Sequence, residues 1–393
     1  MKPLVEMLVA TRLSLMTLPQ RMGSSLVIVV CMACVVGVLV SLLSVTVGLL
    51  QASEVAGSPS RAIVFSKDAY PGPGGRPEEA SHISREALAV LEGAPYMARF
   101  ADGKPVIEAE VLGILPPVEG FASGSLFIRG LGRNSLAMRP EFRITEGRLF
   151  RPGMHEVIVG RGAAKVFGLE VGDTIIMPDG EWPIVGSFSA GGSIMEAELV
   201  GDAPTVMSAV MRTTNFSSVL IGLDSPDSFD AFKSWLTSNP ALSLTAERQS
   251  DYYRRVARRY SSFFTSVAYL VGMIMALGAL FGSVKILHGS VDSRAREIAA
   301  LRAIGYGGVA VAVSVILEAV ALSVIGALIG AGIARVLFDG RWQAIFNAVF
   351  TLSISPQLVA LGVAWAMLIA ALGGLAPAIR SARLPVAEAL RRS

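Results

Sequence analysis

The chain has 393 residues, of which 52% are hydrophobic and only 17% are charged. Soluble domains average about 25% charged residues, so this composition excludes an ordinary soluble protein. The net charge of +3 is too small to indicate a nucleic-acid partner. Both cysteines, Cys31 and Cys34, lie inside the first apolar stretch, which favours small apolar residues over a metal or redox pair.

Four long apolar stretches carry the excess hydrophobicity. A helix needs about 20 apolar residues to cross the hydrocarbon of a bilayer. The sequence predicts membrane spans at 26–50, 261–285, 309–337 and 356–378. The first follows a basic, amphipathic segment at 1–25, and it is longer than the roughly 7–15 apolar residues of a signal peptide. We therefore predict that it remains as an uncleaved span.

The distribution of Lys and Arg predicts that both termini lie in the cytoplasm. Basic residues gather in the N-terminal segment, in the loop at 286–308 and in the tail at 379–393. The segment at 51–260 and the short loop at 338–355 then lie outside.

One basic cluster lies on the side predicted to be outside, directly before the second span: Arg254, Arg255, Arg258 and Arg259. Long loops translocate largely regardless of their charge, so the predicted orientation stands. The role of this cluster stays unassigned at this stage.

The segment at 51–260 is long enough to form a domain with its own core. Its first part, Ser53 to Ala80, is rich in Pro, Gly and Ser and is expected to be a loop. Helices are expected near 84–91, 162–167 and 226–236. Strand-like runs alternate with turns at 106–115, 125–130, 155–160, 173–177, 182–188 and 217–223. The prediction is an α-helical four-span protein with a large mixed α/β domain inserted between spans 1 and 2.

No motif predicts catalysis. The chain has no GxxxxGK[ST] loop, no G-x-S-x-G elbow and no HExxH, and its three histidines lack metal-ligand spacing. The carboxylates of the outside domain are scattered, and we expect them to be solvated surface residues. We predict no catalytic residue, no metal site and no bound cofactor.

The most informative segment lies between the second and third spans and reads SVDSRAREIAALRAIGYGG, from 290 to 308. Asp292 or Ser293 can cap a helix, whose apolar residues form one band with polar edges. The pattern fits two interpretations, an interfacial anchor and a helix that docks on a partner. The candidate residues are Arg294, Arg296, Glu297, Ile298, Leu301, Arg302, Ile304 and Gly305.

At these residues the chain resembles permeases of MacB/FtsX-type ABC transporters. SRAREIAALRAIGY is similar to the R-x-x-E-I-x-x-L-R-A-x-G signature of that family. LEAVALSVIGALIG (317–330) and PAIRSARLPVAEALR (377–391) resemble its third-span and C-terminal patterns. In the outside domain, ITEGRLFRPG and VGDTI followed by WPIVGSF resemble the MacB-like periplasmic core domain.

The resemblance implies a bacterial inner-membrane protein whose segment at 294–305 is a coupling helix seated in an ABC ATPase. The ATPase dimer would hold ATP and Mg and, since this sequence has no ATPase part, would be a separate chain. A second permease copy, identical or paralogous, would complete the membrane part. The second span would transmit the ATPase motion to the periplasmic domain.

Small residues and one acid stand out inside the spans. Two glycine pairs, Gly278 with Gly282 and Gly326 with Gly330, allow two helices to approach closely. We favour packing within one protomer over a contact between two protomers. Glu318 is costly in a bilayer and is expected to face a partner. A coupling role and a purely structural role remain open for it.

The leading functional prediction is an export permease that works with a periplasmic adaptor. A lipoprotein-extracting permease of the LolC/LolE kind is the first alternative. FtsX-like signalling to a cell-wall hydrolase is the second, and the large outside domain argues against it. The sequence does not identify the substrate.

Overall fold

The chain divides into two compact units. The computed structural model describes residues 22–69, 76–115, 126–132, 134–212, 214–293, 299, 303–304, 307–345 and 348–383. The first unit, called the membrane unit below, comprises Met1–Val45, Phe263–Asp339 and Ser353–Ser393. The second unit, called the core domain, comprises Thr46–Ser262 and Gly340–Leu352.

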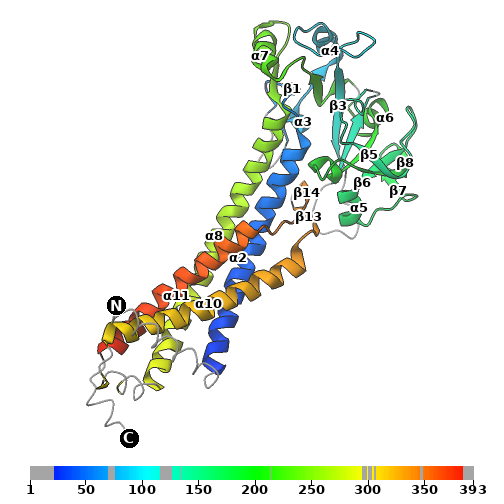
Figure 1. The fold of residues 1–393 in the computed structure, drawn as a ribbon. Helices are drawn as coiled ribbons and strands as arrows, with labels where there is room; N and C mark the ends of the chain where they lie inside the picture. The colour runs from blue at the N-terminus through cyan, green and yellow to red at the C-terminus, as the bar shows by residue number, and fades with distance from the viewer. Residues whose placement is uncertain are drawn as a thin grey trace. The chain divides into compact units, whose positions relative to one another are not determined.

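Four helices are long and apolar enough to cross a membrane: α2 (Met22–Ala56), α8 (Gln249–Ser293), α10 (Gly308–Phe338) and α11 (Pro356–Arg383). The predicted four-span architecture is therefore confirmed, and Figure 1 shows α10 and α11 side by side. Helices α2 and α8 extend past the predicted spans into the core domain. Hydropathy reports only the apolar part of a helix, so it could not reveal these extensions.

The core domain is built on a ten-stranded mixed sheet. Its strands follow the order β12 (Leu244–Arg248), β1 (Arg61–Ser66), β11 (Ser218–Gly222), β3 (Ile107–Ile114), β4 (Phe127–Leu131), β9 (Glu198–Asp202), β6 (Val157–Gly160), β8 (Gly180–Ser189) and β5 (Arg143–Gly147), with β7 (Thr174–Met177) paired to β8. The pairs β4–β9 and β6–β8 are parallel, and the others are antiparallel. The mixed α/β prediction is thus confirmed.

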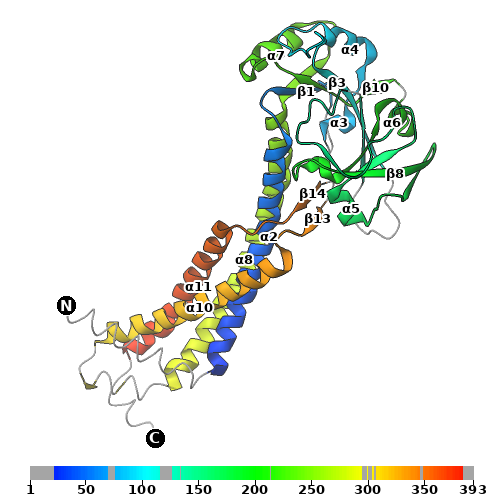
Figure 2. The same cartoon turned by 45° about the vertical axis from the view of Figure 1, so that its right-hand side comes forward.

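Two of the hydrophobic clusters of this domain pack its helices against the sheet. One packs α4 (Arg85–Glu92) and α7 (Phe229–Ser238) near β1 and β11, with Phe232 and Leu236 fully buried. The other joins α5 (Arg161–Phe167) and α6 (Ala203–Ala209) to β6 and β8 around Trp182. A short pair, β2 (Ile83–Ser84) with β10 (Asn215–Phe216), lies outside the large sheet. Figure 2 shows the sheet and these helices from a second side.

The expectation of a loop over Ser53 to Ala80 is wrong. This stretch contains the end of α2, strand β1 and the short helix α3 (Pro77–Ala80). The residues RAIVFS form β1 because pairing with β11 and β12 buries their apolar side chains. Proline fits the first turn of a helix, where its missing N–H is no loss, so Pro77 starts α3.

The loop predicted at 338–355 contains a hairpin, β13 (Trp342–Ile345) with β14 (Ala348–Thr351), that belongs to the core domain. Its strand β14 lies against α2 at Gly48, where an added Cβ would meet the carbonyl oxygen of Thr351 at 2.1 Å. Two residues earlier, the Thr46 hydroxyl donates to the carbonyl oxygen of Ser261 at 3.4 Å. The hairpin, α2 and α8 therefore meet at one level of the core domain.

Candidate functional site

A fully buried cluster of six charged residues lies in the core domain beside the first turns of α8. This charge cluster consists of three arginines and three glutamates, each at most 3% exposed: Arg76, Glu78, Glu110, Arg129, Arg139 and Glu198. Opposite charges balance within it. Buried charges without partners would cost several kcal/mol each, so the arrangement depends on complete pairing.

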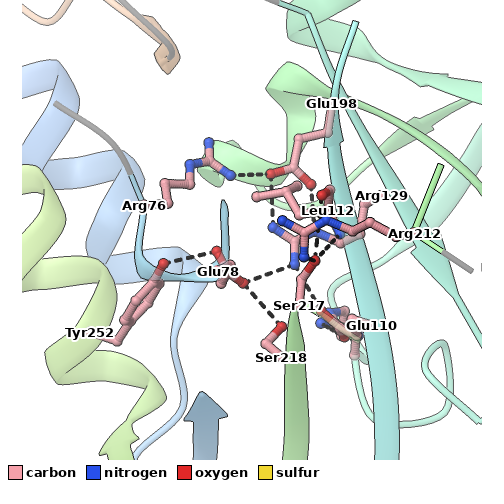
Figure 3. A network of polar contacts seen from close by, with 11 residues as sticks. Arg76, Glu78, Glu110, Leu112, Arg129, Glu198, Arg212, Ser217, Ser218 and Tyr252 are labelled. Atoms are coloured by element: carbon pink, nitrogen blue, oxygen red, sulfur yellow. Dashed lines mark hydrogen bonds and ion pairs between the residues drawn. The ribbon is translucent and has the colours of Figure 1, made fainter. Parts of the chain in front are cut away.

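Arg129 on β4 is the centre of the cluster (Figure 3). Its Nε and Nη2 donate to the two carboxylate oxygens of Glu198 at 2.6 and 3.0 Å, a bidentate pair. Its Nη1 donates to Glu110 Oε2 at 2.8 Å and to Glu78 Oε1 at 3.1 Å. One guanidinium therefore holds carboxylates from β9, β3 and α3 together.

Two further arginines complete the charge balance. Arg76 donates from Nη1 to Glu198 and places its guanidinium 4.6 Å from the centre of the Phe127 ring. Arg139 donates from Nη2 to Glu110. Each glutamate is thus bound by at least one arginine, and the removal of any member leaves a buried charge without its full set of partners.

Tyr252 connects α8 to the cluster. Its hydroxyl donates to Glu78 Oε2 at 2.8 Å, and the side chain is 0% exposed. The Ser218 hydroxyl of β11 donates to the other oxygen of the same carboxylate, Oε1, at 3.3 Å. Figure 3 shows Tyr252 pointing from the helix toward Glu78, across from Ser218. Glu78 therefore receives one hydrogen bond from the helix and two from the sheet, those of Ser218 and Arg129.

The arginines keep the buried glutamates ionised. Burial alone would raise the pKa of Glu198, but attraction to Arg129 and Arg76 outweighs it and lowers that pKa from 4.5 to about 2. The pKa of Glu78 is lowered as well, because the attraction of Arg129 and Arg76 outweighs its burial. A lowered pKa stabilises the fold above the unfolded-state value near 4.5, and this stabilisation is lost as the pH falls toward 2.

The expectation that the carboxylates of this domain are solvated is wrong for Glu78, Glu110 and Glu198. A signal for the cluster was present in the sequence. Arg129 interrupts the apolar run SLFIRG, and Glu110 interrupts VIEAEVLGIL. A charge inside an apolar strand is expected to have a buried partner. The partners could not be assigned from the sequence, because they come from distant segments and the sequence predicts a loop where α3 lies.

The predicted coupling segment lies mostly outside the described residues. This applies to Arg294, Arg296, Glu297, Ile298, Leu301, Arg302 and Gly305. Ile304 is described and is 77% exposed. Nearby, Val291 of α8 packs with Val311, Val315 and Ala378, so the ends of three membrane helices meet beside this segment.

The two glycine pairs have different surroundings. An added Cβ at Gly326 or Gly330 would lie 2.4 or 2.2 Å from a carbonyl oxygen of α2, that of Val29 or Ala33. These glycines therefore allow α10 to pack closely on α2. Around Gly278 and Gly282 the described residues leave open space. Glu318 is 5% exposed and so is not directed at lipid.

Among the described ranges, no group of three or more His, Cys, Asp or Glu side chains could hold a metal ion. The core domain does contain a cavity of about 770 Å³ lined partly by Glu92, Glu108 and Asp202. Burial raises the pKa of Glu108 to about 7. No residue of the charge cluster lines this cavity.

Comparison with known protein families gives a match for each of the two parts of the chain. The MacB-like periplasmic core domain family matches residues 25–239, and the FtsX-like permease C-terminal family matches residues 269–386. The chain belongs to the MacB/FtsX-type family of ABC transporter permeases. All six residues of the charge cluster lie within the region matched by the MacB-like periplasmic core domain, and Tyr252 follows that region.

Individual relatives are distant. The macrolide export ATP-binding/permease protein MacB 2 of Aeromonas hydrophila is 24% identical over 83% of this chain and 52% of its own length. LolC of the lipoprotein-releasing system of Xylella fastidiosa is 24% identical over 79% of this chain and 81% of its own. The uncharacterized permease YknZ of Bacillus subtilis is 26% identical over 47% of each chain. The chain thus spans about half the length of YknZ and MacB 2.

Among solved structures, the periplasmic region of MacB from Actinobacillus actinomycetemcomitans is similar to this chain with a TM-score of 0.36 and 14% identity. The match covers 53% of this chain and 97% of that structure. A TM-score this low supports no conclusion beyond the sequence families.

The charge cluster predicts a large stability effect from a small substitution. Glu198→Gln keeps the side-chain shape but leaves the three buried arginines with only two carboxylates, so we expect a loss of about 3–5 kcal/mol in the free energy of unfolding. Thermal unfolding of the full-length permease in detergent measures it. The control is Asp102→Asn, which breaks the exposed Lys104–Asp102 pair and should change the melting temperature little. Equal melting temperatures for the two variants would contradict this account.

Proposed function

We propose that this ABC transporter permease couples ATP hydrolysis by an ABC ATPase to movement of its core domain. The observation that carries the proposal is the continuity of α8. This helix of 45 residues begins at Gln249, three residues before Tyr252, and ends at Ser293, directly before the predicted coupling segment at 294–305. Its length of about 68 Å is more than twice the roughly 30 Å of bilayer hydrocarbon.

In the proposed mechanism, α8 transmits movement along its length as a rigid helix. Closure of the ATPase moves the coupling segment, and the continuous helix carries this displacement to Tyr252. The hydrogen bond from Tyr252 to Glu78 passes it to Arg129, which is bound to carboxylates from three other elements. Because breaking any of these contacts leaves a buried charge partly unpaired, the sheet moves with the helix.

The topology and partners follow from the same proposal. Both termini lie in the cytoplasm and the core domain in the periplasm, with the spans in the bacterial inner membrane, as the Lys and Arg distribution predicts. ATP and Mg bind to the ATPase partner, and the permease itself is non-catalytic and holds no cofactor. A second permease copy, identical or paralogous, completes the membrane part and has Gly278 and Gly282 available for helix contact.

Export with a periplasmic adaptor is the transport function that we propose. It is supported by the family of the core domain and by the MacB 2 relative, which is named for macrolide export and aligns over 83% of this chain. Lipoprotein release is the second candidate. It is favoured by LolC, which aligns over 81% of its own length. Copurification from native membranes with mass spectrometry separates them, because an adaptor protein supports export and a bound lipoprotein supports release.

The coupling segment gives a test of the ATPase contact. Leu301→Asp places a charge in the apolar band, and desolvating it in an ATPase pocket without a partner costs several kcal/mol. Since each 1.4 kcal/mol is a tenfold loss of affinity, we expect ATPase capture to fall at least tenfold. Glu297→Lys should weaken it too. Pull-down at matched expression measures this.

Ala303→Asp is the matched control, because it adds the same charge on the other side of the predicted helix, and it should retain the ATPase. If both Leu301→Asp and Glu297→Lys hold the ATPase and support its activity as the wild type does, this segment is not the coupling element.

The link between α8 and the charge cluster gives a second test. Tyr252→Phe and Ser218→Ala each remove one hydroxyl that donates to Glu78, but only Tyr252 lies on α8. We expect Tyr252→Phe to lower transport per ATP hydrolysed by about tenfold, because the helix loses its hydrogen bond to Glu78. Binding of the ATPase should persist. Ser218→Ala should retain most transport. Equal transport in the two variants would argue against transmission through Tyr252.

A further inference from the structure

Four arginines form one basic face on the part of α8 that belongs to the core domain. They occupy positions i, i+1, i+4 and i+5, so they share one side of the helix, and all are exposed: Arg254, Arg255, Arg258 and Arg259. The opposite side packs into the domain through Tyr253 and Ala257, each at most 2% exposed, and the buried Tyr252 lies at the border, where its ring centre is 5.5 Å from the Arg255 guanidinium. The basic face therefore borders the buried side of the helix at Arg255 and is otherwise exposed.

Only half of this face is neutralised within the chain. Arg255 pairs with Glu247 at 3.0 Å, and Arg254 lies 3.7 Å from Asp251. For Arg258 and Arg259, no carboxylate in the described part of the chain lies within ion-pair distance. Two adjacent guanidinium groups thus carry uncompensated charge on an exposed surface.

The sequence places these two arginines at the edge of the bilayer. The apolar run of α8 begins at Phe263, four residues after Arg259. At about 1.5 Å per residue, Arg258 and Arg259 lie roughly 6–8 Å of helix from that run. The headgroup layer on each side of a bilayer is about 5–7 Å thick, so both guanidinium groups reach the level of lipid phosphates.

A second observation concerns the contacts among the β13–β14 hairpin, α2 and α8. The β13–β14 hairpin joins α10 to α11 outside the spans and lies against Gly48 of α2. Thr46, half a turn away on α2, donates to the carbonyl oxygen of Ser261 on α8. The helix turn that follows Arg258 and Arg259 therefore lies beside the part of α2 at which the core domain begins, Thr46.

We propose that Arg258 and Arg259 bind the phosphate groups of anionic lipids in the leaflet that faces the core domain. A guanidinium group binds phosphate through two parallel hydrogen bonds, and among the described residues no carboxylate pairs with either of these exposed arginines. Contact between two copies of this face would bring like charges together, which disfavours a second permease as the occupant. The site accounts for a basic cluster on the side of the membrane where such clusters are uncommon.

The test compares lipid that remains bound to full-length permease variants. Wild type, Arg258→Gln/Arg259→Gln and the charge-retaining Arg258→Lys/Arg259→Lys are purified from vesicles of equal phosphatidylglycerol and phosphatidylcholine content, and bound lipid is quantified by mass spectrometry. Each arginine near an anionic surface contributes about fivefold in affinity, so the glutamine variant should lose at least tenfold in phosphatidylglycerol enrichment. The lysine variant should keep most of it.

Two controls keep the result interpretable. Arg85→Gln/Arg143→Gln removes two exposed arginines elsewhere in the core domain and should bind lipid as the wild type does. Inorganic phosphate at millimolar concentration should not displace the bound lipid, and unchanged thermal unfolding shows that each variant is folded. Enrichment that survives in the glutamine variant, or that free phosphate abolishes, would overturn the inference, as would an acidic protein that copurifies with the wild type in place of lipid.

Discussion

The binding of three buried carboxylates by Arg129 is the interaction on which the core domain depends. Glu198, Glu110 and Glu78 come from β9, β3 and α3, which are separated by long stretches of sequence. Ionised groups can leave water only if they meet partners of opposite charge, so these elements must assemble together. A hydrophobic replacement of the whole cluster could be equally stable, but it would not fix their geometry so specifically.

This constraint also attaches the membrane helix to the domain. Tyr252 reaches Glu78 from the first turns of α8, beside the basic face, since its ring centre lies 5.5 Å from the Arg255 guanidinium. The first turns of this helix therefore contact a buried carboxylate through Tyr252 and also present exposed arginines. In the proposed mechanism, the first contact transmits movement to the sheet, and the second holds the helix at the lipid headgroups.

Much of the architecture could be predicted from the sequence, because it depends on local patterns. Apolar runs predicted four spans, and alternation predicted strands such as β3, β6 and β11. The charge cluster could not be derived in this way, because its pairs join residues up to 122 positions apart, as between Arg76 and Glu198. The prediction was wrong at α3, the short helix that carries Glu78, because the Pro- and Gly-rich composition of this stretch is typical of a loop.

The central claim is that the first turns of α8 and the core domain move as one body. The most direct measurement is the distance between spin labels at Arg254→Cys on α8 and Ser208→Cys on α6, both exposed, with Cys31 and Cys34 replaced by alanine. It is made by pulsed electron paramagnetic resonance on the permease with its ATPase. The account predicts the same narrow distance with and without ATP in a functional complex. A distance that changes on ATP binding would contradict it.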